Sequence, residues 1–596
     1  MAKKPQLGTH PTKVWRFLLS YWWMILILLG SVSIQVWASL QLPNMMANIV
    51  NNGIVAEDQN VIITTGLQML GVAAIGGVAM VLTGFLSAKI GTGFSQKVRT
   101  AVFEKVESFS MAEINKFSTA SLITRSTNDV QQLQQVSVIV MRMVLQAPIM
   151  AVGAVINALN TAPNMAWIMA LSVAAFLILV VTVFFLVMPK FKIIQKLVDK
   201  LNLVARENLT GLRIIRAFRN EKYEEKKFDK ANEDLTRLNL WINRAMSLMQ
   251  PIMMLLVNGT ILAIVWVGAH FIATNDLEIG NMMAFMQYAM QVIMSFLFLA
   301  VLMIFLPRAQ VSAKRIGEIL STKLSIREPK NPVAPDAKLR GVVEFRNVTF
   351  SYPDAETPIL NDINFVAKPG QTTAFIGSTG SGKSTIVNLI PRFYDVSAGQ
   401  VLINDVDVRK MSSEDLISRI GFVPQKGVLF SGTVESNIKY GAPKISEKEM
   451  QKAATVAQAD FIKKLDGAFN HHIAQGGSNV SGGQKQRLAI ARAIAKNPEI
   501  YVFDDSFSAL DYKTDAKLRE ALKPITKDST VLIVAQRIST IKQAEQIIVL
   551  NEGKIVRYGT HTELLKNCEV YQEIARSQFS ESEMAKEMKD AKEAKR

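Results

Sequence analysis

A glycine-rich stretch in the second half of this 596-residue chain decides the fold around it: Gly377-Ser378-Thr379-Gly380-Ser381-Gly382-Lys383-Ser384-Thr385. Residues 373–376 before it predict a buried strand, and residues 384–390 predict the beginning of a helix. A glycine-rich loop between a strand and a helix binds phosphate, because its backbone N–H groups and the helix N-terminus surround the anion. In such a loop Lys383 brings positive charge to the β- and γ-phosphates, and Ser384 is a ligand of Mg²⁺. The stretch therefore predicts an α/β P-loop nucleotide-binding domain.

Further motifs accompany the phosphate loop. Residues 500–503 predict an apolar strand that ends in Asp504, whose carboxylate is expected to bind Mg²⁺ directly or through water. A second glycine-rich motif, 480–484, opens a predicted helix. These motifs together resemble the ATP-binding cassette (ABC) transporter family. The resemblance implies that the cofactors are ATP and Mg²⁺.

The resemblance also implies a role for several single residues. Tyr352 lies 25 residues before Gly377 and is expected to stack on adenine, with a buried residue at a strand edge as the alternative. Gln425 is expected to contact Mg²⁺ and the interface with the membrane domain. The residues expected to bind ATP are Tyr352, Gly377, Ser378, Thr379, Gly380, Ser381, Gly382, Lys383, Ser384, Thr385, Gln425 and Asp504, of which Ser384, Gln425 and Asp504 are the expected Mg²⁺ ligands.

The second glycine-rich motif matches the family signature, with Val480 in place of the usual Leu. In the family this motif binds the γ-phosphate of an ATP that is held by the opposite cassette, so two cassettes assemble head to tail. One chain supplies one cassette, and the resemblance therefore implies a second ABC half-transporter subunit as partner. The signature residues expected to contact the partner's ATP are Ser481, Gly482, Gly483 and Gln484.

Two positions depart from the family pattern. The family has a Glu after the strand-ending Asp to polarise the attacking water, and a His in a later switch motif to contact the γ-phosphate; this chain has Asp505 and Gln536. The shorter carboxylate is expected roughly 1–1.5 Å back from the water, and a displacement of about 1 Å costs on the order of 10²-fold in rate. Gln536 keeps a hydrogen-bond donor but does not titrate near neutral pH. A lesser departure is Gln475, where the family usually has Glu.

Both departures fall on catalytic roles, while the residues expected to bind ATP are kept. This pattern resembles the degenerate half of heterodimeric ABC exporters. It implies that the site built on Lys383 and Asp504 hydrolyses ATP slowly, and that the signature motif completes an active site on the partner. A homodimer with a weak, Asp-based ATPase is the alternative.

The composition indicates a membrane protein. Apolar residues make up 49% of the chain and concentrate before about residue 307, and the length exceeds what one hydrophobic core supports. The net charge of +17 fits Lys and Arg near anionic lipid head groups, and no basic stripe with interleaved aromatic residues favours nucleic-acid binding. With Cys568 as the one cysteine, no intramolecular disulfide is available, and His471 and His472 are expected in a loop.

Six segments are apolar over enough length to cross a bilayer, the third being interrupted by Arg142 and Gln146. The first follows a short basic N-terminus without a cleavage pattern, so we expect a retained membrane helix. The positive-inside rule places the basic loops and both termini in the cytoplasm, at the cell membrane. The predicted spans are 18–43, 61–88, 135–158, 165–189, 246–273 and 281–306; the loops 46–60, 159–164 and 273–281 lack Lys and Arg, whereas 1–16, 89–134 and 190–245 are rich in both.

The two long basic stretches are predicted to extend the membrane helices into the cytoplasm. Residues 118–130 resemble the family segment after the first coupling helix, and residues 207–218 resemble the second coupling segment, which in the family is a short transverse helix. A generic charged hairpin is the alternative. The prolines Pro329, Pro332 and Pro335 mark a linker. The predicted division is a transmembrane domain at 1–322, a linker at 323–340, a cassette at 341–577 and a charged tail at 578–596.

The order of a six-span membrane domain followed by a cassette resembles ABC exporters. We expect ATP hydrolysis coupled to efflux of drugs or other lipophilic compounds, with a lipid or peptide exporter as the alternative and an ATP-gated channel as one from another class. Methionines are abundant around the last two predicted spans and would suit varied ligands, although they would equally suit contact with lipid. Gln287 and Gln291 lie one turn apart and are expected to face protein or water.

Overall fold

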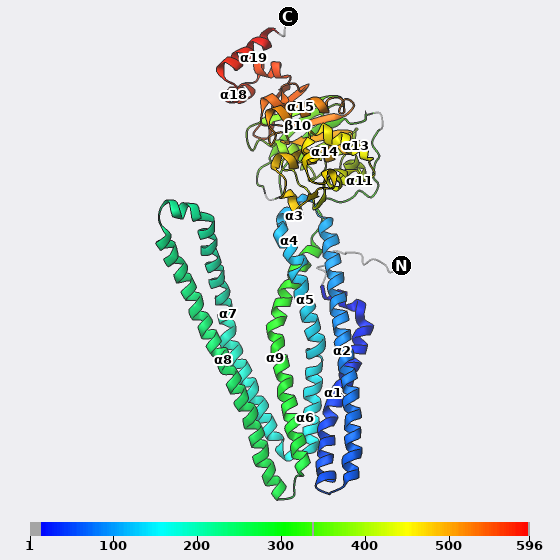
Figure 1. The fold of residues 1–596 in the computed structure, drawn as a ribbon, viewed down its shortest axis with the longest axis vertical. Helices are drawn as coiled ribbons and strands as arrows, with labels where there is room; N and C mark the ends of the chain where they lie inside the picture. The colour runs from blue at the N-terminus through cyan, green and yellow to red at the C-terminus, as the bar shows by residue number, and fades with distance from the viewer. Residues whose placement is uncertain (1–13, 337–338, 354, 594–596) are drawn as a thin grey trace. The chain divides into compact units, whose positions relative to one another are not determined.

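The computed structural model describes residues 14–336, 339–353 and 355–593, and the chain divides into two compact units, drawn together in Figure 1. The first unit comprises residues up to 107 together with 120–322. The second comprises residues 108–119 together with 323 onward, so a short piece of the N-terminal half belongs to the cassette unit. This piece carries α3 (Met111–Phe117), which begins after Ser110, whose side chain accepts from the N–H of Ala112.

The described residues of the first unit include six helical stretches that are long and apolar enough to span a membrane, which confirms the six predicted spans. Helix α1 packs on α2 and α6 packs on α9, while α7 and α8 form a hairpin that contacts the other membrane helices chiefly through α9. The elements are the 3₁₀ helix η1 (Val14–Tyr21), α1 (Trp22–Asn48), α2 (Gln59–Glu107), α4 (Thr119–Ser126), α5 (Asn128–Ile139), α6 (Gln146–Thr161), α7 (Ala166–Ala217), α8 (Glu221–Ala273) and α9 (Ile279–Ser321).

The third span is irregular where its sequence is least apolar. A π-helical turn, Val140–Val144, joins α5 to α6 and contains Arg142. Pro148 follows at the start of α6 and has no N–H to donate to the carbonyl four residues earlier, which disfavours regular α-helix through this point. The span therefore crosses as two α-helices with a wider turn between them.

Helix α9 supports the first span at its proline. Pro43 lies inside α1, so the carbonyl of Ser39 has no donor from its own helix. Gln291 of α9 donates to that carbonyl at 3.2 Å, and the Tyr288 hydroxyl donates to the carbonyl of Leu40 at 2.8 Å. Gln291 thus faces protein, as its sequence position predicted, whereas Gln287 is exposed on this unit.

One sequence-based expectation is wrong. Residues 207–217 do not form a separate short helix but the C-terminal end of the long helix α7. No proline interrupts the segment, and the chain turns only at Arg219, whose φ of 50° is left-handed, before α8 begins at Glu221. Residues 207–220 are therefore the end of a continuous helix followed by a tight turn.

The described residues of the cassette unit form two main sheets and a small antiparallel pair, β7-β8. A six-stranded sheet has the order β12-β11-β3-β10-β9-β6 and is parallel except for β12, and a four-stranded antiparallel sheet has the order β2-β1-β4-β5. The strands are β1 (Val343–Phe350), β2 (Leu360–Ala367), β3 (Thr372–Gly377), β4 (Ala398–Ile403), β5 (Val406–Asp407), β6 (Ile420–Val423), β7 (Gly432–Thr433), β8 (His472–Ile473), β9 (Ile500–Asp504), β10 (Thr530–Val534), β11 (Gln546–Asn551) and β12 (Lys554–Gly559).

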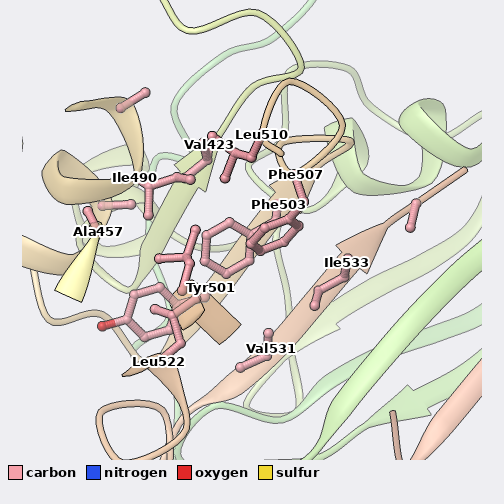
Figure 2. Close-up of a cluster of buried hydrophobic side chains, with 14 of the residues drawn as sticks. Val423, Ala457, Ile490, Tyr501, Phe503, Phe507, Leu510, Leu522, Val531 and Ile533 are labelled. Carbon is pink, nitrogen blue, oxygen red and sulfur yellow. The ribbon is translucent and has the colours of Figure 1, made fainter. Parts of the chain in front are cut away.

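Every residue of β9 and β10 is buried, because the sheet has a hydrophobic core on each face. Figure 2 shows one core, in which Tyr501 and Phe503 of β9 lie beside Val531 and Ile533 of β10. Alternate residues of β9 belong to the other core. The helices of this unit, besides α3, are α10 (Lys383–Leu389), α11 (Ser413–Ser418), α12 (Val434–Ile438), α13 (Glu447–Val456), α14 (Gly482–Ala495), α15 (Tyr512–Leu522), α16 (Ile538–Ile541), α17 (His561–Asn567), α18 (Glu569–Gln578) and α19 (Glu581–Glu593).

The six apolar helices and the P-loop α/β domain are the fold class that the sequence predicted. The charged C-terminal segment contains a helix, α19, that contacts α17. The last three residues of the chain, like its first thirteen, lie outside the described residues.

Candidate functional site

The predicted phosphate-binding, Mg²⁺-binding and catalytic residues lie at the carboxyl ends of four neighbouring parallel strands. Strand β3 leads into the phosphate loop, β10 ends two residues before Gln536, β9 ends in Asp504, and β6 ends two residues before Gln425. Open α/β sheets bind ligands at this edge of the sheet. Strand pairing therefore brings together residues that are far apart along the chain.

The phosphate loop has the backbone that its glycines predict. Gly380 and Gly382 have φ values of +84° and +96°, a region that side chains with a Cβ rarely adopt. The Lys383 ammonium donates to the carbonyls of Gly377 at 3.0 Å and Ser378 at 2.7 Å, and burial lowers its pKa. The Ser381 hydroxyl is buried and has no hydrogen-bond partner among the described residues. A buried orphan hydroxyl in this loop fits a phosphate oxygen as its partner.

Ser384 and Asp504 fit the requirements of Mg²⁺. The Ser384 hydroxyl donates to Asp504 Oδ1 at 2.7 Å, and Asp504 is buried. Burial raises the pKa of Asp504, and the neighbouring charge of Asp505 adds to the rise, so a cation beside this carboxylate would favour its ionised form. The described residues contain no cluster of three His, Cys, Asp or Glu side chains suited to a metal. Two protein oxygens suit Mg²⁺, which usually takes its other ligands from water and nucleotide phosphates.

The two departures from the family pattern contact each other. Gln536 Nε2 donates to Asp505 Oδ2 at 2.8 Å, and Gln425 Nε2 donates to the same oxygen at 3.2 Å. Asp505 is buried, its backbone is left-handed with φ 48°, and burial raises its pKa against the opposing hydrogen bonds. One carboxylate oxygen therefore accepts two hydrogen bonds from neutral amides. We call these three residues the Asp505 cluster.

Tyr352 lies among other aromatic rings beside the phosphate loop. Its hydroxyl is 3.1 Å from the Thr385 hydroxyl, and its ring meets Phe350 and Tyr394 edge to face. The Tyr394 hydroxyl in turn accepts from Asn115 of α3 at 3.1 Å. The stacking of Tyr352 on adenine stays a prediction.

The signature motif forms the N-terminus of α14. Ser481 and Gln484 make a reciprocal capping box, in which each side chain accepts from the other residue's backbone N–H. Gly482 is exposed, and a Cβ added to it would meet nothing within 4 Å in this unit. No hydrogen bond between described residues joins the motif to the phosphate loop of the same chain. The fold of this chain therefore gives no reason for glycine at position 482.

Two glutamines near the site were missed by the sequence reasoning. Gln486 is buried in α14, accepts from the N–H of Gly427 at 2.9 Å and donates to the carbonyl of Pro424 at 3.0 Å. It thereby holds the loop that carries Gln425. Its position two residues after the end of the signature motif was the feature of the sequence that could have indicated this role. Gln578, the last residue of α18, contacts the loop between β10 and α16 that carries Gln536, which we call the switch loop, and no pattern in the sequence indicated that contact.

Two family models match the chain, and both describe ABC transporters. Residues 24–296 match the family model described as ABC transporter transmembrane region, and residues 360–508 match the model described as ABC transporter. An ABC transporter ATP-binding protein of Mycobacterium tuberculosis (strain ATCC 25618 / H37Rv) is 42% identical, over 91% of this chain and 93% of its own length. Another from Bacillus subtilis (strain 168) is 35% identical, over 91% of this chain and 94% of its own length.

Two further matches are a relative named for its cargo and a solved structure. A fatty acid ABC transporter ATP-binding/permease protein of Mycobacterium tuberculosis (strain CDC 1551 / Oshkosh) is 31% identical, over 76% of this chain and 72% of its own length. The solved structure of a bacterial Atm1-family ABC exporter with ATP bound matches with a TM-score of 0.73 and 23% identity, over 95% of this chain and 99% of that one. At that identity the structural match shows the fold.

Proposed function

The chain belongs to the ABC transporter family, and we propose that it is the half of a heterodimeric exporter whose own ATP site hydrolyses slowly. As an ABC exporter subunit it binds ATP and couples hydrolysis to transport across a membrane. The proposal adds that fast hydrolysis takes place at a site on a second, different half-transporter, which this chain's signature motif completes.

The Asp505 cluster carries the proposal of a slow site. Gln425 and Gln536 hold the Asp505 carboxylate through Oδ2, which leaves Oδ1 as the oxygen that could polarise a water molecule. The Asp side chain is one methylene shorter than Glu, so it reaches less far towards a γ-phosphate. Gln536 stays neutral throughout the physiological range and cannot take up a proton. The residues that bind phosphate and Mg²⁺ are all kept, so we expect ATP to bind without rapid hydrolysis.

Two exposed surfaces support the need for a partner. Gly482 has free space around it on this chain, which suits the approach of an ATP bound elsewhere. Leu209, Ile214 and Phe218, at the cytoplasmic end of α7 in the proposed orientation, are 78%, 65% and 79% exposed. Apolar side chains this exposed outside a membrane favour contact with another protein. A homodimer with a weak ATPase remains the second candidate, because it would satisfy the same two surfaces.

In this proposal Ser384, Asp504 and Gln425 would hold Mg²⁺, and Lys383 would turn from the carbonyls of Gly377 and Ser378 to the β- and γ-phosphates. Mg²⁺, when bound, would neutralise phosphate charge. The Ser381 hydroxyl would gain the partner that it lacks. Tyr352 would present its ring to adenine.

We propose a lipophilic cargo and a multidrug or lipid exporter in the cell membrane, with both termini in the cytoplasm. The relative named as a fatty acid transporter supports an apolar cargo. Basic loops on one side of the spans support the orientation. ATP-dependent uphill accumulation of a lipophilic dye in inside-out vesicles would separate this pump from an ATP-gated channel.

The test of the slow site compares the full-length chain alone with the chain paired with a half-transporter that has Glu and His at the two catalytic positions. Turnover of ATP is expected to rise about tenfold or more on pairing, given the cost of a misplaced catalytic group. Equal turnover by the chain alone and by the pair would contradict the heterodimer and favour the homodimer.

A further inference from the structure

The switch loop that carries Gln536 is bound from behind by the C-terminal segment, which we define as α18 and α19 (residues 569–593). The side chain of Gln578 makes two hydrogen bonds with this loop. Its Nε2 donates to the carbonyl of Gln536 at 2.7 Å, and its Oε1 accepts from the N–H of Ile538 at 2.9 Å. A single amide thus spans both sides of Arg537 and fixes the backbone on which the Gln536 side chain stands.

The same segment also contacts helix α16, which follows the switch loop. Ile538 begins the one-turn helix α16, and Lys542 follows its end. The Lys542 ammonium forms an ion pair with Glu587 of α19, whose carboxylate also lies 3.3 Å from His561 Nε2. Both ends of α16 therefore have partners in the C-terminal segment.

Hydrophobic packing fixes α18 against α16. Tyr571 and Ala575 of α18 are fully buried in the same core as Ile538 and Ile541 of α16. The Tyr571 hydroxyl lies 2.7 Å from His561 Nδ1, which orients the imidazole towards Glu587. Buried side chains of this size restrict the movement of α18 relative to the switch. Gln578 itself is exposed, so its two hydrogen bonds are not needed to bury a polar group.

We infer that Gln578 is a positioning residue for ATP hydrolysis, which acts by holding the backbone of Gln536 so that the Gln536 amide stays on Asp505. The inference rests on Gln536 being the switch residue, as in the proposed function. The chain of contacts runs from Gln578 to the Gln536 carbonyl and from the Gln536 amide to Asp505 Oδ2. Tyr512 makes a second contact with the switch loop, because its ring lies 4.9 Å from the Arg537 guanidinium. That contact ties the switch to the start of α15, whereas Gln578 ties it to the C-terminal segment.

The chain offers a matched control on the same helix. Gln572 of α18 also uses its amide to bind backbone, donating to the carbonyl of Leu565 at 2.8 Å, but this carbonyl belongs to α17 and not to the switch. Replacing each glutamine with Met keeps side-chain length and removes the hydrogen bonds. Any general loosening of α18 should therefore appear in both variants.

The first experiment measures hydrogen exchange of the backbone amides in residues 535–541 in the full-length chain. Gln578→Met is expected to speed exchange in this segment about tenfold, the factor that corresponds to about 1.4 kcal/mol of lost stabilisation. Gln572→Met should leave it unchanged. Gln578→Glu keeps the acceptor for the Ile538 N–H and should exchange more slowly than Gln578→Met. Unchanged exchange in Gln578→Met, or equal acceleration in both Met variants, would overturn the inference.

The second experiment measures single-turnover ATP hydrolysis with the full-length chain in excess, which detects slow turnover. Gln578→Met is expected to lower the rate at a saturating concentration of the chain about threefold or more, since small displacements of catalytic groups are costly. The chain concentration for half-maximal rate should not change, because Lys383 and the phosphate loop are untouched. A change in that concentration with an unaltered maximal rate would refute the positioning role. Fast hydrolysis by the unmodified chain would contradict the proposed slow site but not the positioning role of Gln578. The hydrogen-exchange result does not depend on how fast the site hydrolyses ATP.

Discussion

The phosphate-loop edge and the signature edge of the cassette differ in how they use glycine and polar side chains. At the phosphate-loop edge, Gly380 and Gly382 adopt backbone angles that glycine favours, and the Asp505 cluster is joined by hydrogen bonds within the chain. At the signature edge, Gly482 has an ordinary φ and free space around it. Gly380 and Gly382 are therefore explained by the backbone angles of this chain's own phosphate loop. Nothing among the described residues of this chain accounts for the glycine at 482, which fits our proposal that ATP bound by a partner approaches there.

The largest effect is expected from a charged side chain at the signature edge. Gly482→Asp should lower ATP hydrolysis by the assembled pair about 10²-fold or more, comparable to the loss of a key transition-state contact. The reason is that a carboxylate would block and repel the γ-phosphate bound by the partner. ATPase assays on the pair measure this effect.

The fold supplies the control for that variant. Because a Cβ at position 482 meets nothing within 4 Å, Gly482→Asp should unfold at the same temperature as the unmodified chain when measured alone. Hydrolysis by the pair close to the unmodified rate would show that the signature edge has no part in the active site.

A smaller loss is expected at the phosphate-loop edge. Lys383→Ala should weaken ATP binding to this chain about tenfold or more, since a hydrogen bond to a charged group contributes about 1.5–3 kcal/mol. Transport should fall because the cassettes close less readily, yet turnover at the partner's site should stay measurable. Binding of a fluorescent ATP analogue and ATPase activity of the pair test the two parts separately.

The order of the two losses is itself informative. If Lys383→Ala silences the pair while Gly482→Asp has little effect, the active site lies on this chain, and the comparison between the two edges is reversed.

A gain of activity is expected when the Asp505 cluster is restored to the family pattern. Asp505→Glu with Gln536→His should raise hydrolysis at this chain's site about tenfold, part of the cost assigned to a displaced carboxylate. Trapping with a phosphate analogue should then label both cassettes of the pair. The single changes are the controls and should give less than the double change, because the two side chains are in contact.

The extent of that gain depends on the partner. If the partner's signature is also altered, the rescue should be partial until that signature is restored. No gain after both repairs would mean that the Asp505 cluster is not the cause of slow hydrolysis.

The smallest effect concerns the C-terminal segment and pH. Burial lowers the pKa of His561 below its ordinary value, so the folded state binds a proton less readily than the unfolded chain. Its contribution to stability is therefore present above about pH 6.5 and is lost as the pH falls below that value. Exchange of the α19 amides, corrected for its intrinsic pH dependence, should rise about two- to threefold between pH 7.5 and 5.5. His561→Asn should remove most of this dependence, and an equal rise in that variant would contradict the assignment.

Local patterns allowed much of the fold to be predicted. Apolar runs of sufficient length indicated the six spans, and the spacing of Gly377 to Lys383 between a strand and a helix indicated the phosphate loop. Resemblance to the family's motifs supplied the other site residues. Local patterns were insufficient at residues 207–217, where a motif suggested a separate helix but an unbroken run of helix-compatible residues continues α7.

The sequence by itself determined the membrane spans, the nucleotide-binding domain and the two departures at Asp505 and Gln536, because each depends on residue types within a short window. Only the tertiary structure decided which of these side chains meet. Gln425 and Gln536 lie 80 and 31 residues from Asp505, yet both donate to one of its oxygens because β6, β9 and β10 are neighbours in the sheet. Gln578 reaches the switch loop only because α18 packs into the core behind it. Contacts between distant segments follow from strand order and packing, and no short window of the sequence contains that information.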